Sequence, residues 1–158
     1  MTQPFVVREV HDSDGVDQVR RLVLAHADAR ATTPGVEYMR ADALGLPGPY
    51  LPPRGGLWLA TSDHVEIGCV ALRPLDVEAG EVKRMFVDAA WRGHGVGRAL
   101  LEALIDGARA RDYRLLRLGT LHDMTAGRSL YHSLGFTPID RYRADELIDT
   151  TFYELTLT

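Results

Sequence analysis

The feature that most constrains the fold is a strand-like run that leads through a glycine-rich turn into a strongly amphipathic helix, within residues 81–108. Residues 81–87 mix charged and apolar side chains in a β-prone run. The apolar positions that follow advance in steps of three and one, the spacing of one helix face: Val96, Ala99, Leu100, Ala103, Leu104 and Ala108. The segment therefore predicts a strand and a helix joined by one tight turn.

The other elements predict a mixed α+β architecture. Apolar runs predict strands at 5–7, 57–62, 65–72, 115–118, 139–142 and 152–157, and helical spacing predicts helices at 15–30, 36–44 and 126–134. This order favours a largely antiparallel sheet with at least one parallel crossover. Eight of the twelve residues at 45–56 are Gly or Pro, so we expect an exposed connector there, a surface loop beside a site.

Composition predicts one globular domain over residues 1–158, with no nucleic-acid partner and no membrane span. The net charge is −4, which argues against binding nucleic acid by bulk charge. Cys69 is the sole cysteine, so a disulfide framework is excluded, and neither it nor the histidine spacing indicates a metal site. The chain starts without a signal-peptide pattern, and we expect a cytoplasmic protein.

The turn before the helix has the chemistry of an anion cradle. Gly93, Gly95 and Gly97 let backbone N–H groups point at an anion, and the helix N-terminus adds a favourable dipole. Arg92 and Arg98 flank the turn and are suited to phosphate oxygens. The turn matches neither the G-x-G-x-x-G dinucleotide fingerprint nor the G-x-x-x-x-G-K-[ST] triphosphate loop.

Three motifs resemble the GNAT superfamily, the Gcn5-related N-acetyltransferases. Residues 92–97 match R/Q-x-x-G-x-G/A, its acetyl-CoA pyrophosphate loop, and residues 130–136 match L-Y-x-x-L-G-F of the helix that follows the next strand. Residues 81–87 look like the strand that feeds the loop. The resemblance is strong over 57–136, and it implies a mostly antiparallel twisted sheet with a splayed central strand pair and flanking helices.

The resemblance also implies a site for acetyl-CoA as co-substrate, with no metal. It places the pantetheine arm along the backbone of the fourth strand and the pyrophosphate on the turn, which together comprise Met85, Phe86, Val87, Arg92, Gly93, His94, Gly95, Val96, Gly97 and Arg98. One departure stands out, because many members carry asparagine where this chain has Met124, and a thioether cannot replace an amide's hydrogen bonds.

Two residues are the candidates for proton transfer. By resemblance Tyr131 is the general acid for the departing thiolate; the alternative is a half-buried core aromatic. Glu81 lies 11 residues before Arg92, the spacing at which histone-type members carry their catalytic glutamate, although it could equally be a rim carboxylate paired with Lys83 or Arg84. His122 and a water chain are the rival bases.

We therefore expect an N-acetyltransferase that acts on a primary amine by direct attack in a ternary complex. Small cationic amines, amino acids and peptide N-termini are all open as acceptors. Four tyrosines could line the acceptor pocket: Tyr38, Tyr50, Tyr142 and Tyr153. A homodimer is open, since no motif specifies an interface. The alternatives are an acyl-CoA-binding sensor or interaction module without turnover, and a nucleotide-binding enzyme.

Overall fold

A single twisted sheet organises the molecule, and the computed structural model describes residues 4–32, 35–121, 125–144 and 150–157. Within these residues the strand order is β1-β2-β3-β4-β5-β7-β6. The strands are β1 Val6–Glu9, β2 Gly56–Ser62, β3 Val65–Pro74, β4 Ala79–Val87, β5 Leu115–Leu121, β6 Thr137–Ile139 and β7 Thr150–Thr156. The helices are α1 Ser13–Ala29, α2 Val36–Leu44, the short 3-10 helix η1 Ala89–Trp91, α3 Val96–Ala110 and α4 Thr125–Ser133. Neighbouring strands pair antiparallel except β4 and β5, which pair parallel.

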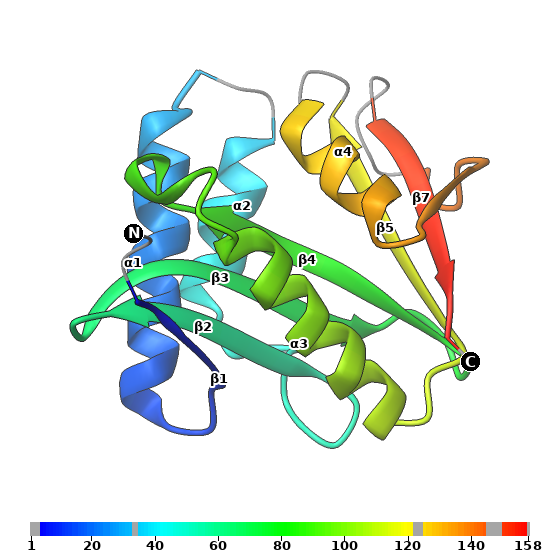
Figure 1. The fold of residues 1–158 in the computed structure, drawn as a ribbon, viewed down its shortest axis with the longest axis horizontal. Helices are drawn as coiled ribbons and strands as arrows, with labels where there is room; N and C mark the ends of the chain where they lie inside the picture. The colour runs from blue at the N-terminus through cyan, green and yellow to red at the C-terminus, as the bar shows by residue number, and fades with distance from the viewer. Residues whose placement is uncertain (1–3, 33–34, 122–124, 145–149, 158) are drawn as a thin grey trace.

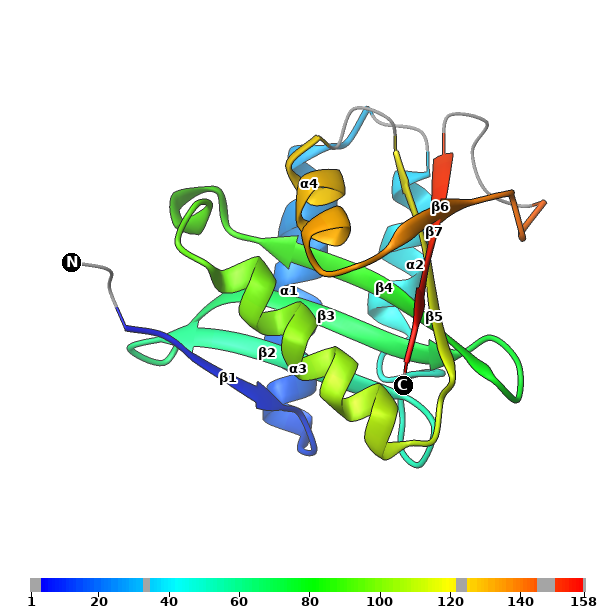
Figure 2. The same cartoon turned by 45° about the vertical axis from the view of Figure 1, so that its right-hand side comes forward.

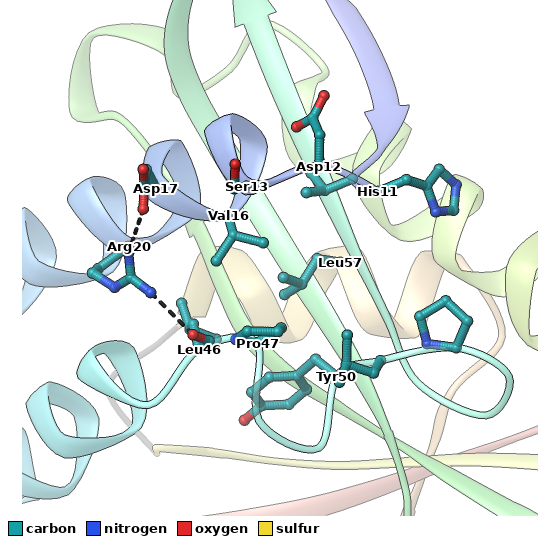
Figure 3. A pocket seen from close by; sticks show the side chains of 13 residues that line it. His11, Asp12, Ser13, Val16, Asp17, Arg20, Leu46, Pro47, Tyr50 and Leu57 are labelled. Atoms are coloured by element: carbon teal, nitrogen blue, oxygen red, sulfur yellow. Dashed lines mark hydrogen bonds and ion pairs between the residues drawn. The ribbon is translucent and has the colours of Figure 1, made fainter.

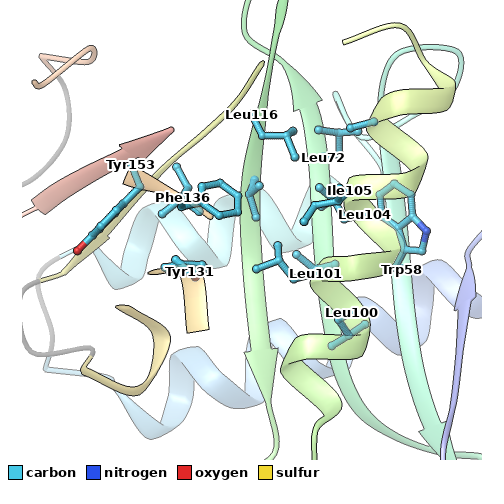
Figure 4. Close-up of a cluster of buried hydrophobic side chains, with 14 of the residues drawn as sticks. Trp58, Leu72, Leu100, Leu101, Leu104, Ile105, Leu116, Tyr131, Phe136 and Tyr153 are labelled. Carbon is cyan, nitrogen blue, oxygen red and sulfur yellow. The ribbon is translucent and has the colours of Figure 1, made fainter. Parts of the chain in front are cut away.

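The helices cover both faces of the sheet (Figures 1 and 2). The predicted amphipathic helix is α3, which buries the apolar stripe that includes Val96, Leu100 and Leu104 against one face. Figure 4 shows this cluster, in which the α3 side chains meet Trp58 and Leu72 of the sheet. A second cluster lies on the opposite face, between the sheet and α1 and α2. The predicted α+β class is confirmed, since α3 connects the parallel neighbours β4 and β5.

The pair β4–β5 stays together over three residues only. Ala79–Glu81 pair with Leu115–Arg117, after which the two strands part (Figure 2). β4 also bulges there, because its register on β3 jumps from Phe86↔Cys69 to Lys83↔Ala71 and so inserts one residue. Arg84 takes φ +53° inside the bulge. A bulge changes the direction of the side chains around it, so it determines which side chains of β4 lie where the two strands part.

Two local predictions were wrong. The strand expected at 139–142 is β6, Thr137–Ile139, because the following residues leave the sheet and Tyr142 instead donates a hydrogen bond to Glu81. The segment 45–56 is not simply an exposed connector, since Leu46 and Tyr50 are 7% and 1% exposed and pack in the second cluster. Glycine and proline content predicts irregular backbone, but it does not report burial.

In the described ranges, no helix is both long and apolar enough to cross a membrane.

Candidate active site

The glycine turn leaves a row of backbone donors at the start of α3. Gly93 and Gly95 have φ +81° and +84°, conformations that a side chain disfavours, and Gly95 is the helix N-cap. Within the described residues, no group accepts a hydrogen bond from the N–H of Val96, Gly97 or Arg98. These donors and the helix dipole suit an anion such as a pyrophosphate. The N–H of His94 differs, because it already donates to the carbonyl of Trp91 at 3.3 Å.

Gly97 marks where three elements converge beside this turn. A Cβ atom at Gly97 would lie 3.1 Å from Met85 Cε and 3.3 Å from Leu130 Cδ2. The glycine thus lets α3 approach both β4 and α4 closely. Met85 belongs to the part of β4 that has left β5, so the turn and the parting strands form one continuous region.

Tyr131 reaches this region from α4. Its ring packs near Phe136 and Tyr153, and it is 8% exposed. Its hydroxyl donates to Met85 Sδ at 3.8 Å, a long contact even for sulfur. Burial raises the pKa of Tyr131 to about 12, so the phenol keeps its proton at neutral pH. The side chain is therefore a core aromatic that also holds a proton beside the splayed part of β4.

Glu81 is buried at the point where β4 and β5 separate. It is 1% exposed, and its Oε1 accepts from Arg73 Nε and Arg143 Nη1, both at 2.8 Å, while Tyr142 donates to Oε2 at 2.7 Å. The alternative of a rim carboxylate paired with Lys83 or Arg84 is wrong, because the chain brings it Arg73 and Arg143 from distant positions. Burial by itself would lower the pKa of the Arg73 guanidinium. The charge and the hydrogen bond of the Glu81 carboxylate together have the larger effect, so the pKa of Arg73 is raised.

His26 of α1 is a site residue that sequence reasoning missed. Its ring stacks on Phe86 of β4 with centroids 3.9 Å apart. Its Nε2 is buried and has no hydrogen-bond partner among the residues that the structure describes. Burial, with Arg30 and Arg92 nearby, lowers the pKa of His26 to about 4. The available signal was helical spacing, since His26 follows Leu22 and Val23 by four and three positions on the buried face of α1.

Arg84 and Asp42 form an ion pair on the α1–α2 side of β4. Arg84 Nε donates to Asp42 Oδ2 at 2.7 Å, and the hydroxyl of Tyr50 donates to the same oxygen at 2.8 Å. Burial raises the pKa of Tyr50, so it stays a donor. Of the four tyrosines proposed for the acceptor pocket, Tyr38 is the exposed one, at 52%. Its ring lies over the Arg84 guanidinium, 5.2 Å from centroid to Cζ.

A cavity of about 420 Å³ lies at the other end of the sheet (Figure 3). Its walls come from the start of α1, the 45–56 segment and the first residues of β2, including Asp12, Tyr50 and Leu57. That end of β2 pairs with the end of β3 that precedes β4, where β4 and β5 are still joined. The loop thus borders a pocket, and Tyr50, one of the four candidate acceptor tyrosines, lines it, whereas Tyr131, Glu81 and the predicted cofactor-binding residues do not.

Two expectations about this region concern residues outside the description. His122, the rival base, and Met124, the departure from the family's asparagine, fall in the undescribed residues 122–124. Across the ranges that the structure does describe, no group of three or more His, Cys, Asp and Glu is arranged to hold a metal.

Comparisons with known proteins agree with one another. A family model described as an acetyltransferase (GNAT) domain matches residues 53–138, more than half of the chain. An uncharacterized N-acetyltransferase of Dictyostelium discoideum is 25% identical over 97% of this chain and 100% of its own length. The N-acetylaspartate synthetase of Danio rerio is 31% identical over 74% of this chain, but the match spans only 39% of that relative.

Solved structures share the fold at low identity. A GNAT-family acetyltransferase of Staphylococcus aureus superposes with a TM-score of 0.83 and 23% identity, covering 98% of this chain and 100% of its own. An acetyltransferase of Salmonella typhimurium, solved with its cofactor acetyl-CoA, has a TM-score of 0.70 and 21% identity, covering 98% of this chain and 94% of its own.

Proposed function

The chain belongs to the GNAT acetyltransferase family and is an acetyl-CoA-dependent acyltransferase, and on that premise we propose that it transfers the acetyl group to a primary amine by direct attack. The observation that carries the proposal is the pairing of free helix-start donors with a buried, protonated phenol, both beside the splayed part of β4. A relative named N-acetylaspartate synthetase is consistent with an amine acceptor.

The donor substrate is proposed to lie along β4 with its pyrophosphate on the glycine turn. Arg92, Gly93, Gly95 and the first turn of α3 would hold the phosphates, with the guanidinium groups of Arg92 and Arg98 adding charge. The N–H of His94 would join them only by giving up its bond to Trp91. The backbone of Met85, Phe86 and Val87 would line the pantetheine arm, because that stretch has left β5 and no described strand pairs with its second edge.

The reaction forms one bond and breaks another. The neutral amine nitrogen attacks the thioester carbonyl carbon, the C–S bond breaks to release the CoA thiolate, and the proton of the amine passes to water. Negative charge that develops on the carbonyl oxygen needs a donor, which we assign to a backbone N–H of Phe86 or Val87 on the open edge of β4. Tyr131 donates to the departing sulfur, and its buried phenol carries the proton throughout the neutral range.

Glu81 is proposed to position the acceptor side rather than to remove the amine proton. Two guanidinium groups and one hydroxyl already donate to its carboxylate, and only 1% of the residue is exposed, so it offers little room for an amine. The Glu81→Gln variant would separate the two roles. If Glu81 is the base, the variant should lose the acidic limb in the pH profile of kcat/KM. If Glu81 positions the acceptor, the variant should keep that limb and show a raised KM for the acceptor.

Ligand-dependent stability tests the proposal first. Acetyl-CoA and CoA should each raise the unfolding midpoint, while ATP and NAD at the same concentration should not. A ligand present at 100 times its Kd adds about 2.7 kcal/mol to the unfolding free energy. Free thiol release with added amines then separates an enzyme from a sensor, because a non-catalytic acyl-CoA module would be stabilised yet release no thiol above the rate without amine.

A matched pair of arginines on α3 controls for general charge effects. The side chains of Arg98 at its start and Arg109 at its end are 46% and 47% exposed. Arg98→Ala should weaken the stabilisation by CoA, and Arg109→Ala should not. Equal behaviour of the two variants would contradict the placement of the pyrophosphate.

A further inference from the structure

One nitrogen of Arg84 is buried and has no partner among the described residues. The side chain is 10% exposed, and Nε donates to Asp42, but no group in the described ranges accepts a hydrogen bond from Nη2. A buried charged donor left unpaired is costly and uncommon in native structures, so it calls for an explanation. Arg84 also carries positive φ inside the bulge of β4, which means that the backbone is bent at the residue that aims this guanidinium.

The group lies on the acceptor side of the parting strands. Arg84 faces Asp42 of α2, whereas its neighbour Met85 contacts Tyr131 of α4 on the opposite face of β4. A thioester held along β4 beside Tyr131 would therefore be approached from the Arg84 side by a second substrate. This puts the unpaired donor within the region where the acceptor must be held.

Guanidinium groups gather on this side of β4. Arg73 and Arg143 both donate to Glu81, whereas Arg84 donates to Asp42 through Nε and keeps Nη2 for a further acceptor. Guanidinium N–H groups match the two oxygens of a carboxylate in geometry and in charge.

We propose that the acceptor is a primary amine that also carries a carboxylate, as amino acids and peptides do, and that Arg84 Nη2 binds this carboxylate. The inference rests on the acetyl-transfer function above. The half-exposed ring of Tyr38 covers the Arg84 guanidinium. This ring must rotate before the carboxylate can reach Nη2.

Reaction products give a test that does not depend on turnover. With CoA saturating, we would measure the Kd of N-acetylglycine, N-acetyl-L-leucine and N-acetyl-L-aspartate, each against its fully amidated counterpart. A hydrogen bond to a charged group predicts that at least one acid binds about tenfold to a hundredfold more tightly than its amide. If no acid binds more tightly than its amide, the inference is wrong.

Arg84→Lys tests the residue itself, and Arg21→Lys is the matched control. Lysine keeps the charge opposite Asp42 but lacks the second N–H branch, so the preference for the acid should fall at least about fivefold. Arg21, paired with Glu66 and 60% exposed on α1, should keep the preference. Stabilisation by CoA reports whether each variant is folded; an Arg84→Lys protein that keeps both the CoA shift and the acid preference would overturn the assignment. If CoA does not stabilise the wild-type protein, the proposed function is wrong, and this inference is wrong with it.

Discussion

Replacing Tyr131 by phenylalanine removes one hydroxyl and leaves the ring packed against Phe136 and Tyr153. The hydroxyl makes one long contact to Met85 Sδ, at 3.8 Å, so its loss should change the unfolding free energy by less than about 1 kcal/mol. Any large fall in activity would then be chemical in origin. This separation of stability from rate makes Tyr131→Phe the sharpest test of the site.

The pKa of the phenol sets the size of the expected effect. An ordinary thiol has a pKa of roughly 8.5, and that of Tyr131 is raised to about 12. Complete proton transfer to such a thiolate would be uphill by about 5 kcal/mol, so we expect Tyr131 to act mainly by hydrogen bonding to the sulfur as it departs. A hydrogen bond to a charged group contributes about 1.5–3 kcal/mol, which corresponds to a fall in kcat of roughly 10- to 150-fold.

The assay is free thiol release under saturating acetyl-CoA and amine, with Tyr113→Phe as control. Tyr113 is also buried, but its hydroxyl donates to the carbonyl of Arg54 at 2.9 Å, and its ring lies beside Gly80 in the part of β4 that still pairs with β5. That variant should lose about 1 kcal/mol of unfolding free energy and keep its kcat. An unchanged kcat in Tyr131→Phe would refute the acid role, and a fall beyond about 10³ would show that the proton is fully transferred.

Three further predictions follow from charge and burial. The fold lowers the pKa of His26 to about 4, so as pH falls the unfolded chain binds a proton before the folded protein does. Between pH 7.5 and 5 the wild type should therefore lose about 2 kcal/mol of unfolding free energy, measured by urea unfolding. The His26→Gln variant should not show this loss. Glu81→Ala removes the buried carboxylate that Arg73 and Arg143 share and should cost about 3–5 kcal/mol in the same assay. Arg98→Ala should raise the KM for acetyl-CoA several-fold in steady-state kinetics, whereas Arg109→Ala should leave it unchanged.

Local patterns were sufficient for the elements and for the anion cradle. The helical spacing from Val96 onward and the glycines before it depend on neighbours in the chain, so the sequence determined α3, its turn and the donors at its start. The order of elements likewise determined the α+β class and a parallel crossover. Tyr131 was found because it stands in a motif of contiguous residues.

Contacts between distant segments were decided by the tertiary structure alone. Glu81 meets Arg143 across 62 positions and Arg84 meets Asp42 across 42, and no local pattern encodes such pairings. The burial of Tyr50 within a Gly- and Pro-rich segment, and the stacking of His26 on Phe86, likewise depend on how α1, α2 and the loop pack on the sheet. Sequence therefore determined where a glycine turn with open backbone donors and a phenol lie along the chain. Only packing decided which charges surround Glu81 and Arg84, because ion pairs form between side chains that the fold brings together.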